Sequence, residues 1–292
     1  MSPRFLVAND DGFAAQGVRT LADRLRALGE VWVVTPDRER SATSHAISLH
    51  KPLRITRHGP REFSLDGTPT DSVYVALHHL MDEPPDLVLS GINHGPNLGN
   101  DVIYSGTVSA AMEGALFGYP ALAVSLCVPD HQAPFDLAHF ETAADFAAKA
   151  ALSVLERPMP TGVLLNINVP ALPRERIRGA KLCRLGYTDW AEAVTVRQDP
   201  RGRPYYWIGG ERSGHDTIVD SDNAAVAQGL IAVTPIHYDL TDYRSFAYAR
   251  GLALDGFAST PDTLGNDPLP HPRHPRAAAD ARQKIPRRPK SG

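Results

Sequence analysis

The sequence predicts an α/β fold, in which a mostly parallel sheet carries helices on both faces in a Rossmann-like three-layer arrangement. From Phe5 to about Leu126, apolar strand-like runs alternate with segments of helical period, which is the pattern of parallel strands joined by crossover helices. Polar loops rich in Gly, Asn, Asp and Ser follow three of these runs. Ligands of open parallel sheets bind beyond the carboxyl ends of strands, so these loops are the expected position of a site.

The elements begin with a strand at residues 5–8, a short apolar run. An apolar stripe of helical period follows, formed by Val18, Leu21, Ala22, Leu25 and Leu28. Gly29 is expected to end this helix, because glycine is common just past a last helical turn. The apolar residues 31–35 predict the second strand.

A second helix is expected after Thr68-Pro69-Thr70-Asp71, where a hydroxyl or a carboxylate can cap its first turn. Its apolar stripe is Val73, Ala76, Leu77 and Leu80. A strand at 87–89 comes next, and a third helix begins near Ser105. That helix is rich in alanine and is expected to pack closely before a strand at 121–126.

The remaining elements start with a helix over 142–155, with Phe146 and Leu152 facing inward, and a strand at 163–168. Two alternating segments, 194–197 and 205–208, flank a Pro/Gly turn and predict a protruding β-hairpin. A helix at 222–228, a strand at 230–234 and a helix at 243–254 complete the prediction. From about residue 259 the composition turns to Pro, His, Arg and Lys, which predicts a disordered tail.

The composition excludes several classes of protein. A chain of 292 residues with 42% hydrophobic content can bury a full core. The net charge of -3 and the pI of 6.4 give no field that would gather nucleic acid, so no stable nucleic-acid complex is expected. Cys127 and Cys183 have no partner at metal-ligand spacing, which favours reduced thiols over a disulfide. With no apolar leader or membrane span, we expect a cytoplasmic protein with no membrane partner.

The most informative stretch is Asn9-Asp10-Asp11-Gly12, directly after the first strand. Two neighbouring carboxylates at the end of a buried strand repel each other and lose solvation, so a cation is needed to keep both ionised at low cost. Asn, Asp and Gly in succession are also typical of a polar turn. Taken alone, this segment does not decide between a metal site and a turn.

Two further loops favour the metal site, because each supplies oxygen ligands after a strand. Ser41 lies in the polar loop after the second strand, and Asn93 lies in the glycine-rich loop after residues 87–89. An Asp pair, a hydroxyl and an amide carbonyl form an all-oxygen set that suits one Mg²⁺ or Mn²⁺ ion and not zinc. Such an ion can acidify a bound water as the nucleophile and neutralise a phosphoryl oxygen.

A phosphate site is predicted next to these ligands, at the start of the third helix. The free N–H groups near Ser105, Gly106 and Thr107 face the same sheet edge, where the helix dipole favours an anion. Asn97, which lies in the same loop as Asn93, can donate a hydrogen bond to the phosphate. Ser105 and Thr107 are also ordinary helix-capping residues, and only their combination with the acidic pair favours a phosphate site. His94 receives no role here.

These motifs together resemble the survival protein E (SurE) family of metal-dependent 5'-nucleotidases. The match is dense through about residue 126 and thinner to about residue 245. The matching segments are Asn9–Gly12, Pro36–Ser41, Gly67–Asp71, Ser90–Asn93, Gly95–Gly99, Asp101–Val108 and Val233–Pro235.

The resemblance implies phosphate release from nucleoside 5'-monophosphates, with 3'-monophosphates and short polyphosphate as further substrates. It places one divalent ion on Asp10, Asp11, Ser41 and Asn93, with Asp10 and Asp11 catalytic. It also implies a homodimer or homotetramer with an exchanged C-terminal segment and a contribution from the hairpin near Pro200. The expected nucleotidase domain spans residues 1–258. Its core is about residues 1–180, and its hairpin and C-terminal arm are about residues 190–258. The tail, residues 259–292, has no counterpart in the family pattern.

Other classes of protein fit less well. A haloacid-dehalogenase-type phosphatase needs two aspartates separated by one residue, a serine hydrolase needs G-x-S-x-G, and a dinucleotide-binding oxidoreductase needs G-x-G-x-x-G after the first strand. None of these patterns is present at the required position. A metal- and nucleotide-binding stress-response module without turnover remains as the alternative from a different class.

Overall fold

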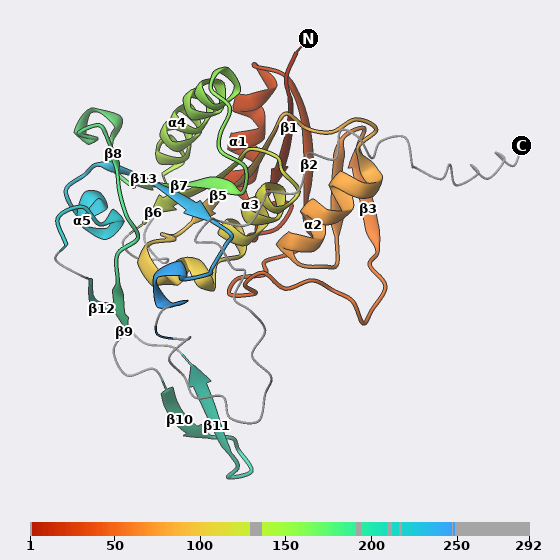
Figure 1. Ribbon diagram of the computed structural model, residues 1–292. Coiled ribbons are helices and arrows are strands. Elements are labelled where there is room, and N and C mark those ends of the chain that lie inside the picture. The colour runs from red at the N-terminus through yellow and green to blue at the C-terminus, as the bar shows by residue number, and fades with distance from the viewer. Residues whose placement is uncertain are drawn as a thin grey trace, which may run out of the picture.

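A nine-stranded sheet forms the centre of the molecule (Figure 1). The structure is a computed structural model that describes residues 2–128, 136–190, 194–208, 212–215, 218–246 and 248. The strand order is β3-β4-β2-β1-β5-β6-β7-β13-β8. The strands are β1 (Arg4–Ala8), β2 (Glu30–Pro36), β3 (Ile55–Gly59), β4 (Glu62–Leu65), β5 (Leu87–His94), β6 (Ala121–Cys127), β7 (Val163–Pro170), β8 (Ala180–Leu182) and β13 (Ile231–His237).

Six neighbouring strands, from β4 to β7, run parallel to one another. Antiparallel pairing joins β3 to β4 and β13 to β7, and β8 is parallel to β13. The central strands are buried along almost their whole length because helices cover both faces. The predicted mostly parallel α/β fold is therefore confirmed.

The helices divide into two layers. On one face, α1 (Gln16–Arg26) and α4 (Leu137–Glu156) pack over a core that contains Phe5, Leu89 and Ile167. On the other, α2 (Pro69–Val75), its π-helical continuation Ala76–Leu80 and α3 (Gly106–Leu116) pack over Leu6, Val88 and Ala123. Helix α5 (Asp222–Ala227) lies beside β13, and 3₁₀ turns occur at Gly99–Ile103, Arg174–Arg176 and Tyr243–Ser245.

Helix α3 packs closely, as its alanine content predicts. Nine of its residues are buried, and a Cβ atom at Gly114 would lie 2.8 Å from Val88 Cβ. The predicted stripe of α1 is also buried, and Thr68 caps α2 by accepting a hydrogen bond from the Asp71 N–H. Gly106, the first residue of α3, lies against Asp10, which follows β1.

Helix α4 differs from its prediction. It begins at Leu137, earlier than expected, and Leu152 is 42% exposed, so the prediction that Leu152 faces inward was wrong. Small alanines and the large Phe140 form the buried stripe instead, while Phe146 packs at its edge. An alanine stripe has little hydrophobic contrast, which is why the helical face was misjudged by one position.

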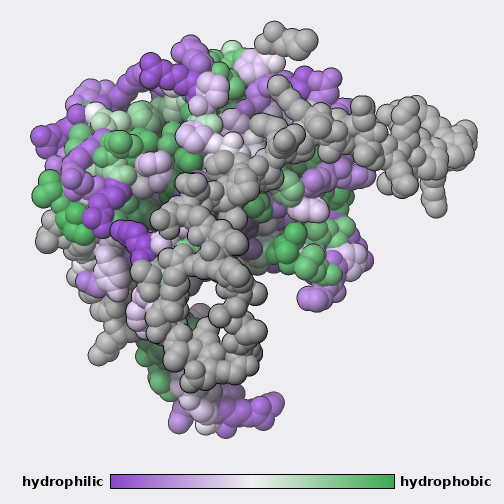
Figure 2. Space-filling model, viewed as in Figure 1, coloured by the Kyte–Doolittle hydropathy of each residue, from purple (hydrophilic) through white to green (hydrophobic). Residues whose placement is uncertain are grey.

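The predicted hairpin is present as β10 (Val194–Gln198) paired antiparallel with β11 (Pro204–Ile208). It protrudes from the body in Figure 1, and Figure 2 shows hydrophobic surface along it and hydrophilic residues at its tip. A second small ribbon pairs β9 (Thr188–Trp190) with β12 (Arg212–His215).

Further expectations concern the thiols, membrane-spanning helices and the C-terminal part of the chain. Both cysteines are buried and free, as predicted. Among the described residues, no helix has the length and apolar character needed to cross a membrane. Of the predicted helix 243–254, the structure describes residues 243–246 and 248; Tyr243–Ser245 form a 3₁₀ turn, and residues 246 and 248 are helical. The end of the predicted C-terminal arm, residues 249–258, and the whole tail 259–292 lie outside the described residues.

Candidate metal and phosphate site

The predicted site lies where the chain changes direction across the sheet. Strand β1 has β2 on one side and β5 on the other, and all three are parallel. The chain moves outward from β1 to β2 and β4, then returns to β5 on the opposite side of β1. Loops that leave β1 and β5 therefore diverge at this point, which is the usual ligand position in such sheets.

Asp10 and Asp11 follow β1 directly and are held by different parts of the protein. Asp10 is 5% exposed, and its carboxylate accepts a hydrogen bond from the Thr107 hydroxyl of α3. The Asp11 carboxylate accepts from the His94 backbone N–H at 3.2 Å. Gly12, with a φ of +95°, completes the turn; a Cβ there would also lie 2.8 Å from the Arg38 carbonyl carbon.

Burial raises the pKa of both carboxyl groups. For Asp11 the pKa rises to about 7, first because of desolvation and second because of the neighbouring charge of Asp10. Desolvation likewise raises the pKa of Asp10, against the opposing effect of the Thr107 hydrogen bond. Two carboxylates that resist ionisation side by side are favourable only with a compensating positive charge. This is the environment expected of a cation site.

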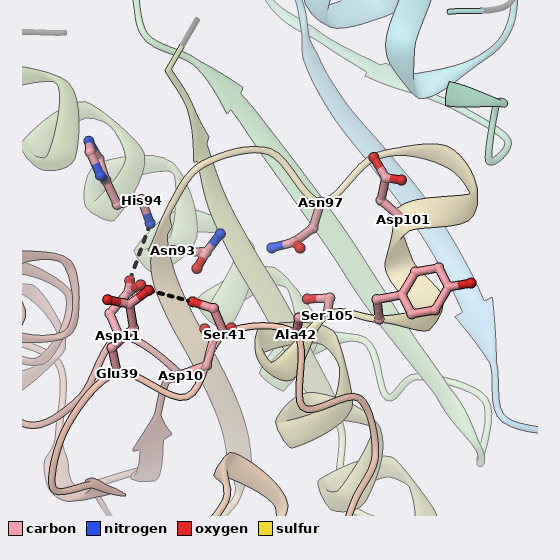
Figure 3. A pocket seen from close by; sticks show the side chains of 11 residues that line it. Asp10, Asp11, Glu39, Ser41, Ala42, Asn93, His94, Asn97, Asp101 and Ser105 are labelled. Carbon is pink, nitrogen blue, oxygen red and sulfur yellow. Dashed lines mark hydrogen bonds between the residues drawn. The ribbon is translucent and has the colours of Figure 1, made fainter. Parts of the chain in front are cut away.

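Asn93 reaches the same place because β5 contains a β-bulge. Between Ser90 and Asn93 the register against β6 shifts by one residue, and such a shift re-aims the following side chains. Gly91 makes the bulge possible, since a Cβ there would lie 2.2 Å from the Val124 carbonyl oxygen. The Asn93 side-chain N–H donates to the Gly95 carbonyl at 2.9 Å, which turns the amide oxygen toward the acidic pair (Figure 3).

Ser41 comes from the loop after β2. The Arg40 N–H donates to the Asp10 carbonyl oxygen at 2.7 Å, so this loop is attached to the acidic turn through the main chain. The Ser41 hydroxyl donates to Glu39 at 2.8 Å, and its oxygen lies beside the acidic pair in Figure 3. All four predicted metal ligands line one pocket.

The donor set suits a hard divalent ion. Across the described parts of the chain, no group of three or more acidic, His or Cys side chains is placed to hold a metal. Beside the acidic pair, Ser41 and Asn93 supply neutral oxygens to the same pocket. Two anionic and two neutral oxygens match the preference of Mg²⁺ and Mn²⁺ and disfavour zinc.

Asn97 is fixed in the pocket by a buried network from two other strands. Its side-chain N–H donates to Ser125 Oγ at 2.8 Å, and its backbone N–H donates to Asn168 Oδ1 at 2.9 Å. Asn166 and Asn168 in turn donate to its carbonyl oxygen at 2.8 and 2.9 Å. A side chain held this firmly is preorganised to contact a ligand.

The residues at the start of α3 have structural roles, and one of them also lines the pocket. Ser105 lines the pocket, and its hydroxyl caps the helix by accepting from the Val108 N–H at 3.0 Å. Thr107 is fully buried and directs its hydroxyl to Asp10. Gly106 lies against Asp10, where a Cβ would be 2.8 Å from Asp10 Cβ. The side chains of Ser105 and Thr107 thus hold the helix start and the acidic pair, and phosphate contact through their N–H groups stays a prediction.

The complete pocket has a volume of about 520 Å³ and contains five residues that the sequence did not mark as candidates. These are Glu39, Ala42, His94, Asp101 and Tyr104. Glu39 lies in the Ser41 loop, and the His94 backbone holds Asp11. Their proximity to the predicted ligands in sequence was the available signal.

Fold and site together define an α/β protein with an acidic, oxygen-lined ligand pocket at the carboxyl edge of a parallel sheet. The model of the survival protein SurE family matches residues 5–192. The chain belongs to this family.

Named relatives and a solved structure agree with this assignment. The 5'-nucleotidase SurE of Anaeromyxobacter dehalogenans (strain 2CP-C) is 52% identical over 261 residues, covering 88% of this chain and 99% of that protein. The 5'-nucleotidase SurE of Geobacter sulfurreducens is 49% identical over 249 residues, covering 85% and 93%. The crystal structure of the SurE protein from Aquifex aeolicus superimposes with a TM-score of 0.75 at 39% identity, covering 85% of this chain and 98% of that one.

Proposed function

We propose that this protein is a divalent-metal-dependent 5'-nucleotidase, which hydrolyses nucleoside 5'-monophosphates to nucleoside and phosphate. The observation that carries the proposal is the acidic pair, buried Asp10 and partly buried Asp11, in one pocket with Ser105, the N-cap residue of α3. A cation site and an anion-binding helix start side by side are what a metal-assisted phosphatase requires. Relatives at about half identity carry the name 5'-nucleotidase SurE.

The proposed metal ligands are Asp10, Asp11, Ser41 and Asn93. When bound, a divalent ion supplies positive charge for a phosphoryl oxygen and lowers the pKa of a water. Thr107 orients Asp10, and the His94 N–H orients Asp11. Asn97 and the N–H groups at the start of α3 bind the phosphate group and hold it against the acidic pair. Mg²⁺ and Mn²⁺ are the ions proposed, on the basis of the oxygen donors.

Phosphate release from nucleoside monophosphates tests this function. The purified protein should release phosphate with Mn²⁺ or Mg²⁺ and lose this activity in excess EDTA. Asp11→Asn should lose at least 100-fold in kcat, since it removes one of two anionic ligands. Asp23→Asn is the matched control, because Asp23 lies on the exposed surface of α1, and it should retain full activity. Metal and nucleotide binding without turnover would instead identify the non-catalytic stress-response module.

We also propose that subunits associate through the hairpin β10–β11. Five of its side chains are large, hydrophobic and more than half exposed: Val194, Val196, Tyr206, Trp207 and Ile208. Contiguous apolar surface of this kind typically marks a protein interface. Sedimentation should report a dimer or a tetramer for the full chain and a smaller species for Trp207→Asp. The exchanged C-terminal segment stays a prediction.

A further inference from the structure

The pocket is larger than its metal and phosphate end requires. A metal ion and a phosphate group each compare in size with a few water molecules, which occupy about 30 Å³ apiece. The pocket volume of about 520 Å³ leaves most of the space unfilled and falls within the ~300–1,000 Å³ typical of sites for organic ligands. In Figure 3, Asp101 marks the end of the pocket opposite the acidic pair.

Tyr104 lines this pocket and follows the 3₁₀ turn that carries Asp101. Its backbone is held from two sides. The Tyr104 N–H donates to the Asp101 carbonyl at 3.0 Å, and its own carbonyl accepts from the Ser44 N–H at 3.2 Å. Despite this fixed backbone, Tyr104 is 64% exposed. An aromatic ring on an immobile segment, open to solvent at a ligand pocket, has no packing role that explains it.

The position of Tyr104 in the chain places it beside the phosphate. It directly precedes Ser105, the N-cap residue of α3, so its ring extends from the same helix start that is proposed to bind the phosphate group. Its other chain neighbour, Ile103, is 66% exposed and does not line the pocket. The His94 ring, the other aromatic group of the pocket, lies against Phe140 and belongs to the metal end.

We infer that Tyr104 is the platform on which the nucleobase of the substrate stacks. The inference rests on the proposed 5'-nucleotidase function. It gives a role to the part of the pocket that the metal ion and the phosphate group do not occupy. With the phosphate at Ser105 and Asn97, the ribose spans the gap and the base covers the Tyr104 ring. Every base has a π-face, so stacking binds purines and pyrimidines alike without reading hydrogen-bonding edges. The structure therefore assigns a nucleotide-selective, base-tolerant pocket.

Ribose 5-phosphate is the substrate that isolates this contribution, because it keeps the sugar and the phosphate and lacks the base. We would measure kcat and KM for AMP, UMP and ribose 5-phosphate in the metal-loaded full chain. Tyr104→Ala should lower kcat/KM for AMP about tenfold, mainly through a higher KM, and UMP should lose less. Tyr104→Ala should hydrolyse ribose 5-phosphate as efficiently as the unmodified protein does.

Two variants serve as controls. Tyr104→Phe keeps the ring and should keep the preference for AMP over ribose 5-phosphate. Ile103→Ala removes an exposed apolar side chain one position away, outside the pocket lining, and should change neither substrate.

Distinct results would overturn the inference. An equal loss on AMP and ribose 5-phosphate would show that Tyr104 only supports the helix start, and unchanged AMP kinetics would place the base elsewhere. If the unmodified protein released phosphate from none of the three compounds, the proposed function would fail and this inference with it. Activity that shows no dependence on Tyr104 would leave the function standing and reject the platform alone.

Discussion

His45 Nε2 lies 2.7 Å from Glu113 Oε2, which joins the loop carrying Ser41 to the middle of α3. Glu113 is buried, with 4% exposure, whereas His45 is partly exposed. A carboxylate only accepts, so the imidazole N–H donates. The same loop is attached by the Ser44 N–H to the Tyr104 carbonyl and by the Ser48 N–H to Asp71. Ser41 is therefore positioned by contacts several residues further along its own loop.

His45→Ala is expected to weaken metal binding without removing a ligand. It leaves the buried Glu113 carboxylate without its partner, which costs about 1–3 kcal/mol, and it loosens the Ser41 loop. Thermal unfolding and a Mn²⁺ titration would measure both effects. His50→Ala, an exposed histidine of the same loop, is the control and should change neither quantity. Unaltered Mn²⁺ affinity in His45→Ala would show that the pair does not position Ser41.

Gly106→Ala is expected to destabilise the protein although alanine favours helices. The gain in helix propensity is at most about 1 kcal/mol. A Cβ at this position would lie 2.8 Å from Asp10 Cβ and 3.1 Å from Pro69 Cγ, and overpacking costs about 1–3 kcal/mol. Because Asp10 must move, metal affinity should fall as well. Gly214→Ala is the control, since a Cβ there meets no atom within 4 Å; an equal, small effect of both substitutions would contradict the packing argument.

Metal affinity is expected to rise with pH. In the metal-free protein, burial raises the pKa of Asp11 from 3.8 to about 7, so this group keeps its proton through mildly acidic pH. Its raised folded-state pKa means that the metal-free fold loses stability as pH increases from about 4 to about 7. An ion must displace the proton, so the association constant should rise about tenfold per pH unit for each proton released, then level off above pH 7.

Calorimetry in buffers of different ionisation enthalpy would count the released protons. For Asp11→Asn the pH dependence should become shallower, because one of the displaced protons is absent. Metal affinity that stays constant between pH 5 and pH 7 would contradict the raised pKa.

Asp222→Ala is expected to be strongly destabilising. Its carboxylate is fully buried and accepts three backbone N–H groups, from Gly99, Gly186 and Asn223, each at 2.9 Å. Each buried donor left without an acceptor costs about 1–3 kcal/mol. Chemical denaturation should therefore show a loss of more than about 2 kcal/mol. Asp220→Ala removes an exposed carboxylate that pairs with Lys181 and should cost less than about 1 kcal/mol. Similar losses in the two variants would refute this assignment.

Much of the central sheet was predictable because its strands are buried on both faces and read as apolar runs. Strand β3 gave no such signal, since Thr56, Arg57 and His58 are exposed at the sheet edge. The predicted strand 87–89 proved too short because β5 continues through a bulge to His94. Residue patterns show which positions are buried, but they do not show where a strand changes register.

Within the site, four residues could be proposed as metal ligands because each carries oxygen and was expected to follow a strand, and the structure places all four around one pocket. The contacts that hold them were not predictable. Asp222 lies 123 positions from Gly99, and Asn168 lies 71 positions from Asn97. No local pattern links such pairs, because only the folded sheet and helices bring them together. Thr107 shows the same limit, since a residue typical of a helix start turned out to face Asp10.

The separation between Asn97 and its partners also bears on how the protein matures during synthesis. All proposed metal ligands and the Thr107 contact belong to the first 107 residues, whereas Asn97 depends on Asn166 and Asn168 of β7. Since chains leave the ribosome with the N-terminal part first, the residues proposed to bind the ion are synthesised before β7, although the bulge that places Asn93 also needs β6. In a nascent chain, the proposed ion site is therefore expected to form once β6 pairs with β5, before β7 fixes Asn97 for substrate binding.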